Sequence, residues 1–260
     1  KNFTGPENSG KMVTVTTTLN LAHRGFSGKY PENTRRAFLA AIEEGRCDGF
    51  ESDVHLSADG EPVIIHDAAL ERTSNGSGTV GDHRFQALRE LDIGSWKGKE
   101  FAGERILHLD ELLEIVLDHH IVLNLEVKNY DVFYQGIEEK VIGRIKALKA
   151  EKAVFLSSFN HISMKKCKGI DQAIRTGLLY SYPLLDAAAY TRSHGIDAVH
   201  PRVSCLAYGP ELTREAHEKG LAVNVWTANT EEEMRFCIEQ GVDSIISNYP
   251  DKLGELLAGG

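Results

Sequence analysis

The chain has 260 residues, 42% of them apolar, so it is long enough for one α/β barrel and too apolar to be disordered. Its net charge of −9 argues against a nucleic-acid-binding protein, because such proteins usually carry a basic surface. No stretch reaches the roughly 18 apolar residues of a transmembrane helix. The four cysteines are far apart, which argues against a zinc site or a disulfide framework. Reduced thiols are typical of a cytoplasmic protein, although a removed signal peptide would leave no trace.

The beginning of the chain differs from the rest. Its first eleven residues are polar and rich in Gly and Asn, and the chain does not start with methionine. We interpret residues 1–18 as a flexible or vector-derived leader, with Met12 as a plausible native start. Residues 19–260 are expected to form a single domain.

Short apolar runs then alternate with amphipathic helical patterns, an order that is typical of parallel βα units. Asn33 is expected to cap the first helix, and Thr230 with Glu233 predicts a capping box for a later one. Eight strands with helices between them predict a (β/α)8 TIM barrel, with a doubly wound sheet as the alternative. The predicted strands are 19–23, 49–54, 121–127, 154–158, 174–179, 197–200, 222–227 and 243–247.

A long insertion of residues 57–108 is expected after the second strand. Residues 57–60 are too few for a parallel crossover to the apolar run at 63–67, so residues 57–67 are predicted to form a hairpin arm. Residues 68–108 are Gly-rich and weakly periodic, and long excursions of this kind on a barrel are usually functional. We therefore expect a lid-like elaboration.

Two predicted strands carry carboxylates where core residues are expected. Glu51 and Asp53 share one face of the second strand, and Asn124, Glu126 and Lys128 share one face of the third. Buried carboxylates are costly unless a cation neutralises them, so the pattern predicts a metal site. Three carboxylates without a thiolate favour a single Mg²⁺ or Ca²⁺ ion over zinc.

Motifs along residues 19–251 resemble the glycerophosphodiester phosphodiesterases, and their order makes the match specific. They are His23-Arg24-Gly25, Pro31-Glu32-Asn33-Thr34, Glu51-Ser52-Asp53-Val54, Asp59-Gly60, His66-Asp67, Arg72-Thr73 before Gly76 and Gly78, Glu126-Val127-Lys128, Val225-Trp226-Thr227 and Tyr249-Pro250-Asp251.

The resemblance implies a TIM-barrel hydrolase that converts small glycerophosphodiesters to sn-glycerol 3-phosphate and an alcohol. It puts His23 and His66 at general acid/base positions, and Glu51, Asp53 and Glu126 at metal positions. It further implies that Arg24 and Lys128 bind phosphate and that Trp226 packs against the glycerol; core packing is the less favoured alternative for Trp226. No nucleic-acid partner is expected, and homo-oligomerisation stays open.

Two segments depart from the family pattern. Ser247-Asn248 replaces a Thr-Asp pair, and Ile106-Leu107-His108-Leu109 replaces Ile-Pro-Thr-Leu. We expect neither to touch the acid/base pair or the metal ligands. Of the other histidines, His200 is retained as a weak pocket candidate because it ends a predicted strand.

Two other functions remain open from the sequence. The first is lysophospholipase D-like cleavage of lysophospholipids, with an acyl groove formed by the insertion from Phe85, Leu88, Leu91, Trp96 and Phe101. The second is a non-catalytic barrel that binds a phosphorylated ligand, against which the complete set of histidines, carboxylates and cations argues.

Overall fold

The computed structural model describes residues 18–259, so most of the expected leader, residues 1–17, lies outside the described residues. Thr18, which the sequence assigns to that leader, belongs to the fold. Its side chain is buried and donates a hydrogen bond to the carbonyl oxygen of Val242 at 2.7 Å. The fold therefore includes Thr18, which was expected in the leader, while Gly260 of the expected domain lies outside the described residues.

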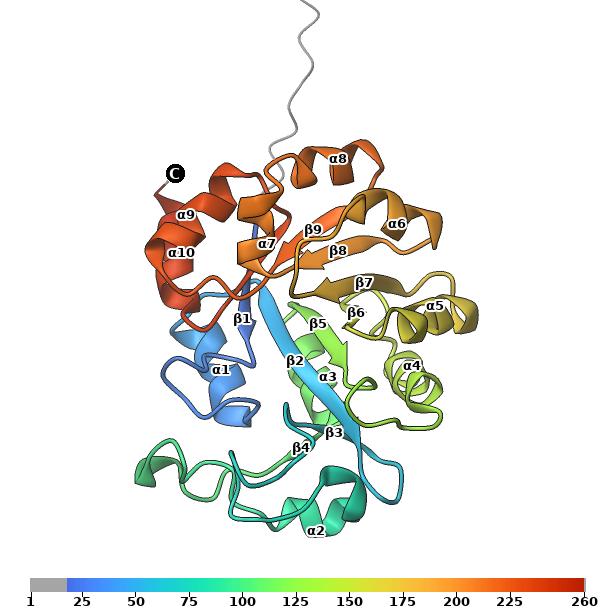
Figure 1. Cartoon of the computed structure of the whole chain (residues 1–260). Helices are drawn as coiled ribbons and strands as arrows, with labels where there is room; N and C mark the ends of the chain where they lie inside the picture. Colours follow the sequence, from blue (N-terminus) through green and yellow to red (C-terminus); the bar gives the residue numbers. More distant parts are fainter. Residues whose placement is uncertain (1–17, 260) are drawn as a thin grey trace, which may run out of the picture.

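Eight parallel strands close into a barrel, which confirms the predicted (β/α)8 fold and excludes the doubly wound sheet (Figure 1). Closure comes from β1, which pairs with β10 on one side and with β2 on the other. The barrel strands are β1 (Leu19–His23), β2 (Gly49–Leu56), β5 (Val122–Val127), β6 (Val154–Ser158), β7 (Arg175–Tyr180), β8 (Ala198–Pro201), β9 (Ala222–Val225) and β10 (Ser244–Ser247).

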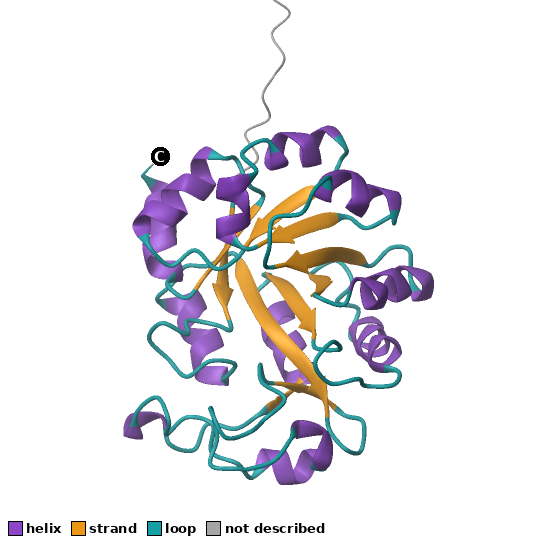
Figure 2. Cartoon of the chain, viewed as in Figure 1, coloured by secondary structure: helices purple, strands orange, loops and turns teal. Residues whose placement is uncertain are grey.

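Helices surround the strands, as the outer purple layer of Figure 2 shows. Their apolar faces pack against the barrel and bury residues such as Phe38, Leu112 and Met234. The helices are α1 (Arg35–Glu43), α3 (Leu109–Asp118), α4 (Ile137–Ala147), α5 (His161–Ile170), α6 (Ala187–Ser193), α7 (Val203–Tyr208), α8 (Leu212–Glu218), α9 (Glu231–Glu239) and α10 (Pro250–Ala258).

Helix capping follows the sequence with one exception. Thr230 and Glu233 form the predicted capping box of α9. The N-cap of α1 is Thr34, whose hydroxyl accepts a hydrogen bond from the amide of Ala37, so the prediction of Asn33 as the cap was wrong. Asn33 is instead buried and hydrogen-bonded to Ser52 and Asp53 of β2, which makes it part of the candidate site.

The insertion begins with the predicted hairpin, since β3 (Pro62–Ile64) runs antiparallel to β2 and to β4 (Leu107–His108). Between β3 and β4 lie α2 (Phe85–Arg89) and two short 3-10 turns, Val80–Asp82 and Lys99–Phe101. This segment has a small core of its own, in which Leu70, Val80, Leu88 and Ile106 are fully buried. It extends beside the barrel at the end of β2, at the bottom of Figure 1, and contributes His66 to the barrel mouth.

The insertion does not form the acyl groove considered from its sequence. Leu88 is fully buried in its core, and Phe85 and Leu91 pack against that core. Phe101 packs against the main barrel core, and only Trp96 of the five candidate residues is substantially exposed. Phe85, Leu88 and Leu91 therefore serve the folding of the insertion itself, and Phe101 attaches it to the barrel.

Candidate active site

Three carboxylates converge at the carboxyl-terminal ends of neighbouring strands. β2 and β5 pair so that Asp53 is opposite Glu126, and Glu51 is opposite Asn124. One ligand oxygen from each of Glu51, Asp53 and Glu126 lies within 4.8 Å of the other two, and all three residues are buried. The period-two alternation of the strands turns these side chains into the barrel, while Phe50 and Val54 turn outward into the helical core.

Two cations lie beside this triad. Lys128 Nζ is 3.0 Å from Glu126 Oε1 and 3.4 Å from Asp53 Oδ1. Arg24 Nε is 3.5 Å from Asp53 Oδ2. Burial opposes the charge on Lys128, but Asp53 and Glu126 raise its pKa above the usual value. The sequence predictions for Arg24 and Lys128 thus correspond to cations at the carboxylate cluster.

The donor set fits a hard divalent cation. Burial favours the neutral form of all three carboxyls, yet Lys128 and Arg24 hold the pKa of Asp53 well below its usual value. Burial and the charge of Asp53 instead raise the pKa values of Glu51 and Glu126. The buried Oδ1 atom of Asp53 has no hydrogen-bond partner. A further positive charge would therefore stabilise the ionised cluster, and oxygen ligands match Mg²⁺ or Ca²⁺.

The backbone after β1 turns sharply to present His23 and Arg24. Arg24 and Gly25 both have positive φ angles, 56° and 76°. A side chain at position 25 would place its Cβ 2.7 Å from the backbone of Ala37, so only glycine fits there. The left-handed conformation of Arg24 is a local strain at the site that the surrounding contacts maintain.

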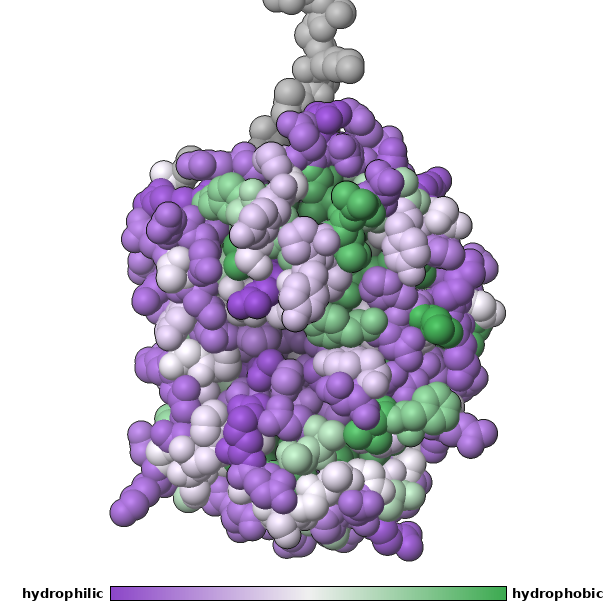
Figure 3. Space-filling view, viewed as in Figure 1, coloured by the Kyte–Doolittle hydropathy of each residue, from purple (hydrophilic) through white to green (hydrophobic). Residues whose placement is uncertain are grey.

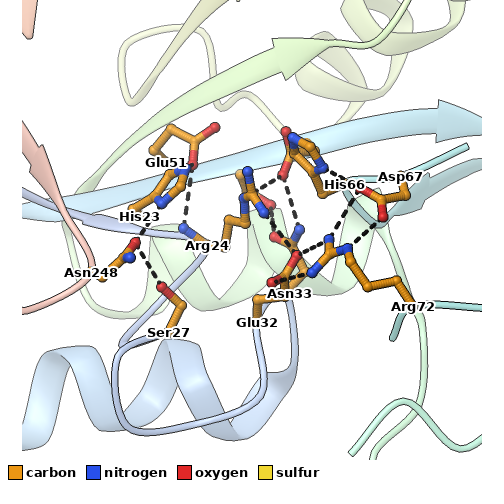
Figure 4. A network of polar contacts seen from close by, with 12 residues as sticks. His23, Arg24, Ser27, Glu32, Asn33, Glu51, His66, Asp67, Arg72 and Asn248 are labelled. Carbon is orange, nitrogen blue, oxygen red and sulfur yellow. Dashed lines mark hydrogen bonds and ion pairs between the residues drawn. The ribbon is translucent and has the colours of Figure 1, made fainter. Parts of the chain in front are cut away.

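His23 is held between Asn248 and Glu51 (Figure 4). Its Nδ1 atom is 2.6 Å from Asn248 Oδ1, and its Nε2 atom is 3.7 Å from Glu51 Oε2. Because the hydroxyl of Ser27 donates to the same Asn248 oxygen, that oxygen is an acceptor and Nδ1 of His23 carries the proton. Burial and the charge of Arg24 lower the pKa of His23 to about 3, so Nε2 holds a free lone pair toward the cavity.

His66 is fixed by a chain of charged contacts from the insertion and the β1–α1 loop. Its Nδ1 atom contacts Asp67 Oδ1, and Arg72 binds both oxygens of Asp67. The same guanidinium donates to both oxygens of Glu32, at 2.9 and 2.7 Å, and Glu32 also accepts from Arg24 at 2.9 Å. Figure 4 shows this chain running from the side chain of Arg24 to that of His66.

Both histidines reach one cavity of about 90 Å³, which is also lined by Glu51, Glu126 and Trp226. Phe159 meets Trp226 edge-to-face, with the ring centroids 5.5 Å apart, and forms an aromatic wall on this side. Trp226 is only partly buried, and its indole nitrogen donates to the carbonyl oxygen of His200. Trp226 thus lines the cavity, and its contact with a ligand stays a prediction.

His200 itself does not line this cavity. It is fully buried inside the barrel, where its Nε2 atom accepts a hydrogen bond from Asn224 at 2.8 Å. A Cβ on Gly177 would lie 2.1 Å from that ring, so glycine makes room for it. The weak assignment of His200 to the pocket is replaced by a role in the core.

The expectation that both departures lie away from the reactive groups was wrong for Ser247-Asn248, since Asn248 contacts His23. His108, in the other departure, caps α3 with Glu111 in a capping box.

The sequence interpretation also missed Tyr130, whose hydroxyl donates to Glu126 Oε1 at 3.1 Å. The alternation of positions 124, 126 and 128 extends to 130 and would have indicated it.

Comparisons with known proteins agree with this geometry. A model of the glycerophosphoryl diester phosphodiesterase family matches residues 23–252. A glycerophosphodiester phosphodiesterase of Caldanaerobacter subterraneus subsp. tengcongensis is 40% identical over 243 residues, 94% of this chain and 99% of that protein. One from Bacillus altitudinis is 33% identical over 90% of this chain and 96% of its own length.

Similar solved structures are phosphodiesterases as well. A phosphodiesterase of Oleispira antarctica, in complex with the product sn-glycerol-3-phosphate, is 30% identical with a TM-score of 0.81, over 92% of this chain and 96% of that one. A glycerophosphodiester phosphodiesterase of Agrobacterium tumefaciens is 27% identical with a TM-score of 0.78, over 92% and 99%. The chain belongs to the glycerophosphoryl diester phosphodiesterase family, and it is a phosphoric diester hydrolase. Within residues 18–259, no helix has the length and apolar character needed to cross a membrane.

Proposed function

We propose that the chain hydrolyses glycerophosphodiesters to sn-glycerol 3-phosphate and an alcohol, with one divalent cation and with His23 and His66 as general acid/base pair. The observation that carries this proposal is that both histidines and two of the three clustered carboxylates line one cavity. The names of the relatives support the substrate class, and so does the product bound to the Oleispira antarctica structure.

Glu51, Asp53 and Glu126 are the proposed metal ligands, with Mg²⁺ and Ca²⁺ as the two candidates. When bound there, the cation would polarise a phosphoryl oxygen and offset the negative charge that develops in the transition state. Asn33 donates to Asp53 at 3.0 Å and Tyr130 donates to Glu126, so both hold carboxylate orientations from outside the ligand set.

The two histidines have different surroundings, which suggests different roles. His23 is neutral with its Nε2 lone pair free, so it suits removal of a proton from the attacking oxygen. The carboxylate of Asp67 contacts Nδ1 of His66 and orients the ring at the cavity, so His66 is the proposed donor of a proton to the alcohol that leaves. When water attacks, a bond forms between phosphorus and the water oxygen, the phosphorus bond to the alcohol oxygen breaks, and sn-glycerol 3-phosphate results directly. When a glycerol hydroxyl attacks, the same bond to the alcohol breaks but a cyclic phosphate results, and water must then break one ring P–O bond to give sn-glycerol 3-phosphate.

Arg24, Lys128 and Trp226 are the proposed substrate-binding residues. The guanidinium and the ammonium can each donate hydrogen bonds to phosphate oxygens, and the triad keeps both charged. The face of Trp226 offers an apolar contact for the carbon atoms of glycerol. The charges of the site would therefore bind the phosphate, while the aromatic wall contacts the organic part.

The test is release of sn-glycerol 3-phosphate from glycerophosphocholine and glycerophosphoethanolamine, measured with Mg²⁺, with Ca²⁺ and with EDTA. The proposal predicts release that depends on a divalent cation and stops in EDTA. Release that is unchanged in EDTA would contradict the metal role. Binding of glycerol phosphate without any hydrolysis would instead favour a non-catalytic barrel.

A further inference from the structure

Exposed apolar side chains are concentrated on one part of the barrel mouth. In residues 18–259, eight of the nine large apolar residues that are more than a third exposed follow β5, β6, β7 or β8. Single exposed apolar residues are ordinary, but a contiguous group marks an interaction surface. We call six of them the apolar rim: Phe133, Ile162, Tyr182, Leu184, Leu185 and Tyr208.

The rim lies beside the entrance to the proposed active site. Figure 3 shows hydrophobic side chains over the β7–α6 loop, α5 and the loop before α4, on one side of a hydrophilic hollow. An aromatic path leads toward it, because Phe159 contacts both Trp226 in the cavity and Tyr130, whose ring centroid is 5.2 Å away. Tyr130 is 38% exposed, and the more exposed Phe133 follows in the same loop.

The side chains of the rim are largely exposed to solvent. Leu185 is 95% exposed, Tyr208 80% and Phe133 79%, and they come from three separate loops or helix ends. Separate protruding side chains suit insertion into a fluid lipid surface, which needs no complementary shape. The tyrosines Tyr182 and Tyr208 are typical of the headgroup level, where one end of the ring is apolar and the other is wet.

Charges beside Leu184, Leu185 and Tyr208 select the kind of lipid, whereas Lys165 is the charged residue beside Ile162. A groove of about 340 Å³ between the β7–α6 loop and α7 is lined by Leu184, Leu185 and Tyr208. The charged residues that line it are all acidic, namely Asp186, Glu211 and Glu215. An anionic surface would be repelled there, whereas the outward cationic groups of zwitterionic headgroups would be attracted.

We propose that the apolar rim docks the enzyme on the surface of zwitterionic lipid aggregates, with the active-site mouth facing the headgroups. This proposal rests on the proposed function, because docking would serve catalysis only if the cavity accepts glycerophosphodiesters. A lipid surface would present phosphodiester-linked glycerol to the cavity. A second copy of this chain, which has a net charge of −9, would be repelled by the acidic groove, and this makes a zwitterionic lipid surface the better occupant.

The test is flotation of the whole chain with vesicles of phosphatidylcholine or phosphatidylglycerol. The variants are Leu185→Ser with Tyr208→Ser, and Trp96→Ser as a control that removes an exposed apolar side chain away from the rim. The proposal predicts binding to phosphatidylcholine in preference to phosphatidylglycerol. It also predicts about tenfold or greater loss of binding in the double variant and little change in the control, because insertion scales with buried apolar area.

Turnover of water-soluble glycerophosphocholine separates this proposal from the proposed function. The double variant should retain wild-type turnover, since neither residue lines the site cavity. If wild type and all variants fail to turn over glycerophosphocholine, the proposed function is contradicted. The flotation result then still decides whether the rim binds lipid. The rim proposal is overturned if wild type does not float with phosphatidylcholine, if the double variant floats equally, or if the rim only holds a dimer in size-exclusion chromatography.

Discussion

Asn248 Oδ1 accepts a hydrogen bond from Nδ1 of His23 at 2.6 Å, so the residue beside the proposed base is an amide and not a carboxylate. An amide orients the imidazole without a negative charge to stabilise its protonated form. Because burial and Arg24 already lower the pKa of His23 to about 3, the neutral form persists over the whole ordinary pH range. This contact therefore fixes the tautomer of His23, while burial and Arg24 keep its imidazole neutral.

The first prediction concerns Asn248→Asp. A carboxylate at this position stabilises the protonated imidazole and raises the pKa of His23, so the acid limb of kcat/KM should move to higher pH. The measurement is the pH profile of the variant beside wild type. Ser27→Ala, which removes only the second donor to Asn248, serves as the control and should leave the limb in place. Superimposable profiles for Asn248→Asp and wild type would contradict the account.

The second prediction separates the roles of the two histidines by the leaving group. His66→Ala should lower turnover of glycerophosphocholine by about 10²–10⁴-fold. Turnover of a glycerophosphodiester whose alcohol is 4-nitrophenol should fall much less, because nitrophenolate leaves without a proton donor. His23→Ala should lower turnover of both substrates. If His66→Ala loses turnover of the nitrophenyl substrate and His23→Ala retains it, His66 is the base and His23 the acid, which reverses the assignment. Circular dichroism and the exposed-residue control His119→Ala check that the fold is intact.

A third prediction concerns Arg72, which joins Asp67 to Glu32. Arg72→Met removes this bridge and allows Asp67 and His66 to move, so kcat should fall by about 10²-fold with little change in KM. Arg72→Lys retains the charge but not the planar fork, and should recover only part of the loss. A large rise in KM at unchanged kcat would show instead that Arg72 binds substrate.

The fourth prediction is a dependence of stability on pH. Burial lowers the pKa of His200 to about 3, below the value of about 6.5 in an unfolded chain. The unfolded state therefore binds the proton more readily, and as pH falls from 6.5 toward 3 this residue lowers the free energy of unfolding by up to about 1.4 kcal/mol per pH unit. His200→Gln should remove that contribution.

This contribution of His200 is measured by urea unfolding of wild type and His200→Gln at several pH values. Groups that titrate in both proteins cancel in the difference, and any loss of packing in the variant is a constant offset. As pH falls, the free energy of unfolding of wild type should decrease relative to that of His200→Gln. A difference that does not change with pH would contradict the buried neutral state of His200.

Much of the barrel and of the carboxylate cluster could be predicted from the sequence. Alternation along β2 and β5 is a local property, so it shows that Glu51 shares a face with Asp53, and Glu126 with Lys128. Parallel strands then bring these faces to the same end of the barrel. The hairpin that begins the insertion was predictable for a similar reason, because a short loop permits only an antiparallel partner.

Contacts that depend on closure could not be predicted in this way. Asn248 and His23 are 225 positions apart and meet only because β10 pairs with β1. Arg72 reaches Glu32 because the insertion folds back beside the β1–α1 loop, and no periodicity indicates that path. The small core of the insertion likewise arises from its tertiary packing, so its apolar residues could be mistaken for a groove.

The most direct test of the central claim is titration of metal-free protein with Mg²⁺ or Ca²⁺ while glycerophosphocholine hydrolysis and heat of binding are followed together. We predict that one equivalent of cation per chain restores turnover, and that Asp53→Asn loses binding and turnover in parallel. The matched control Glu114→Gln, an exposed carboxylate on α3, should behave as wild type. Full turnover without cation, or cation binding unchanged in Asp53→Asn, would contradict a metal site built from Glu51, Asp53 and Glu126.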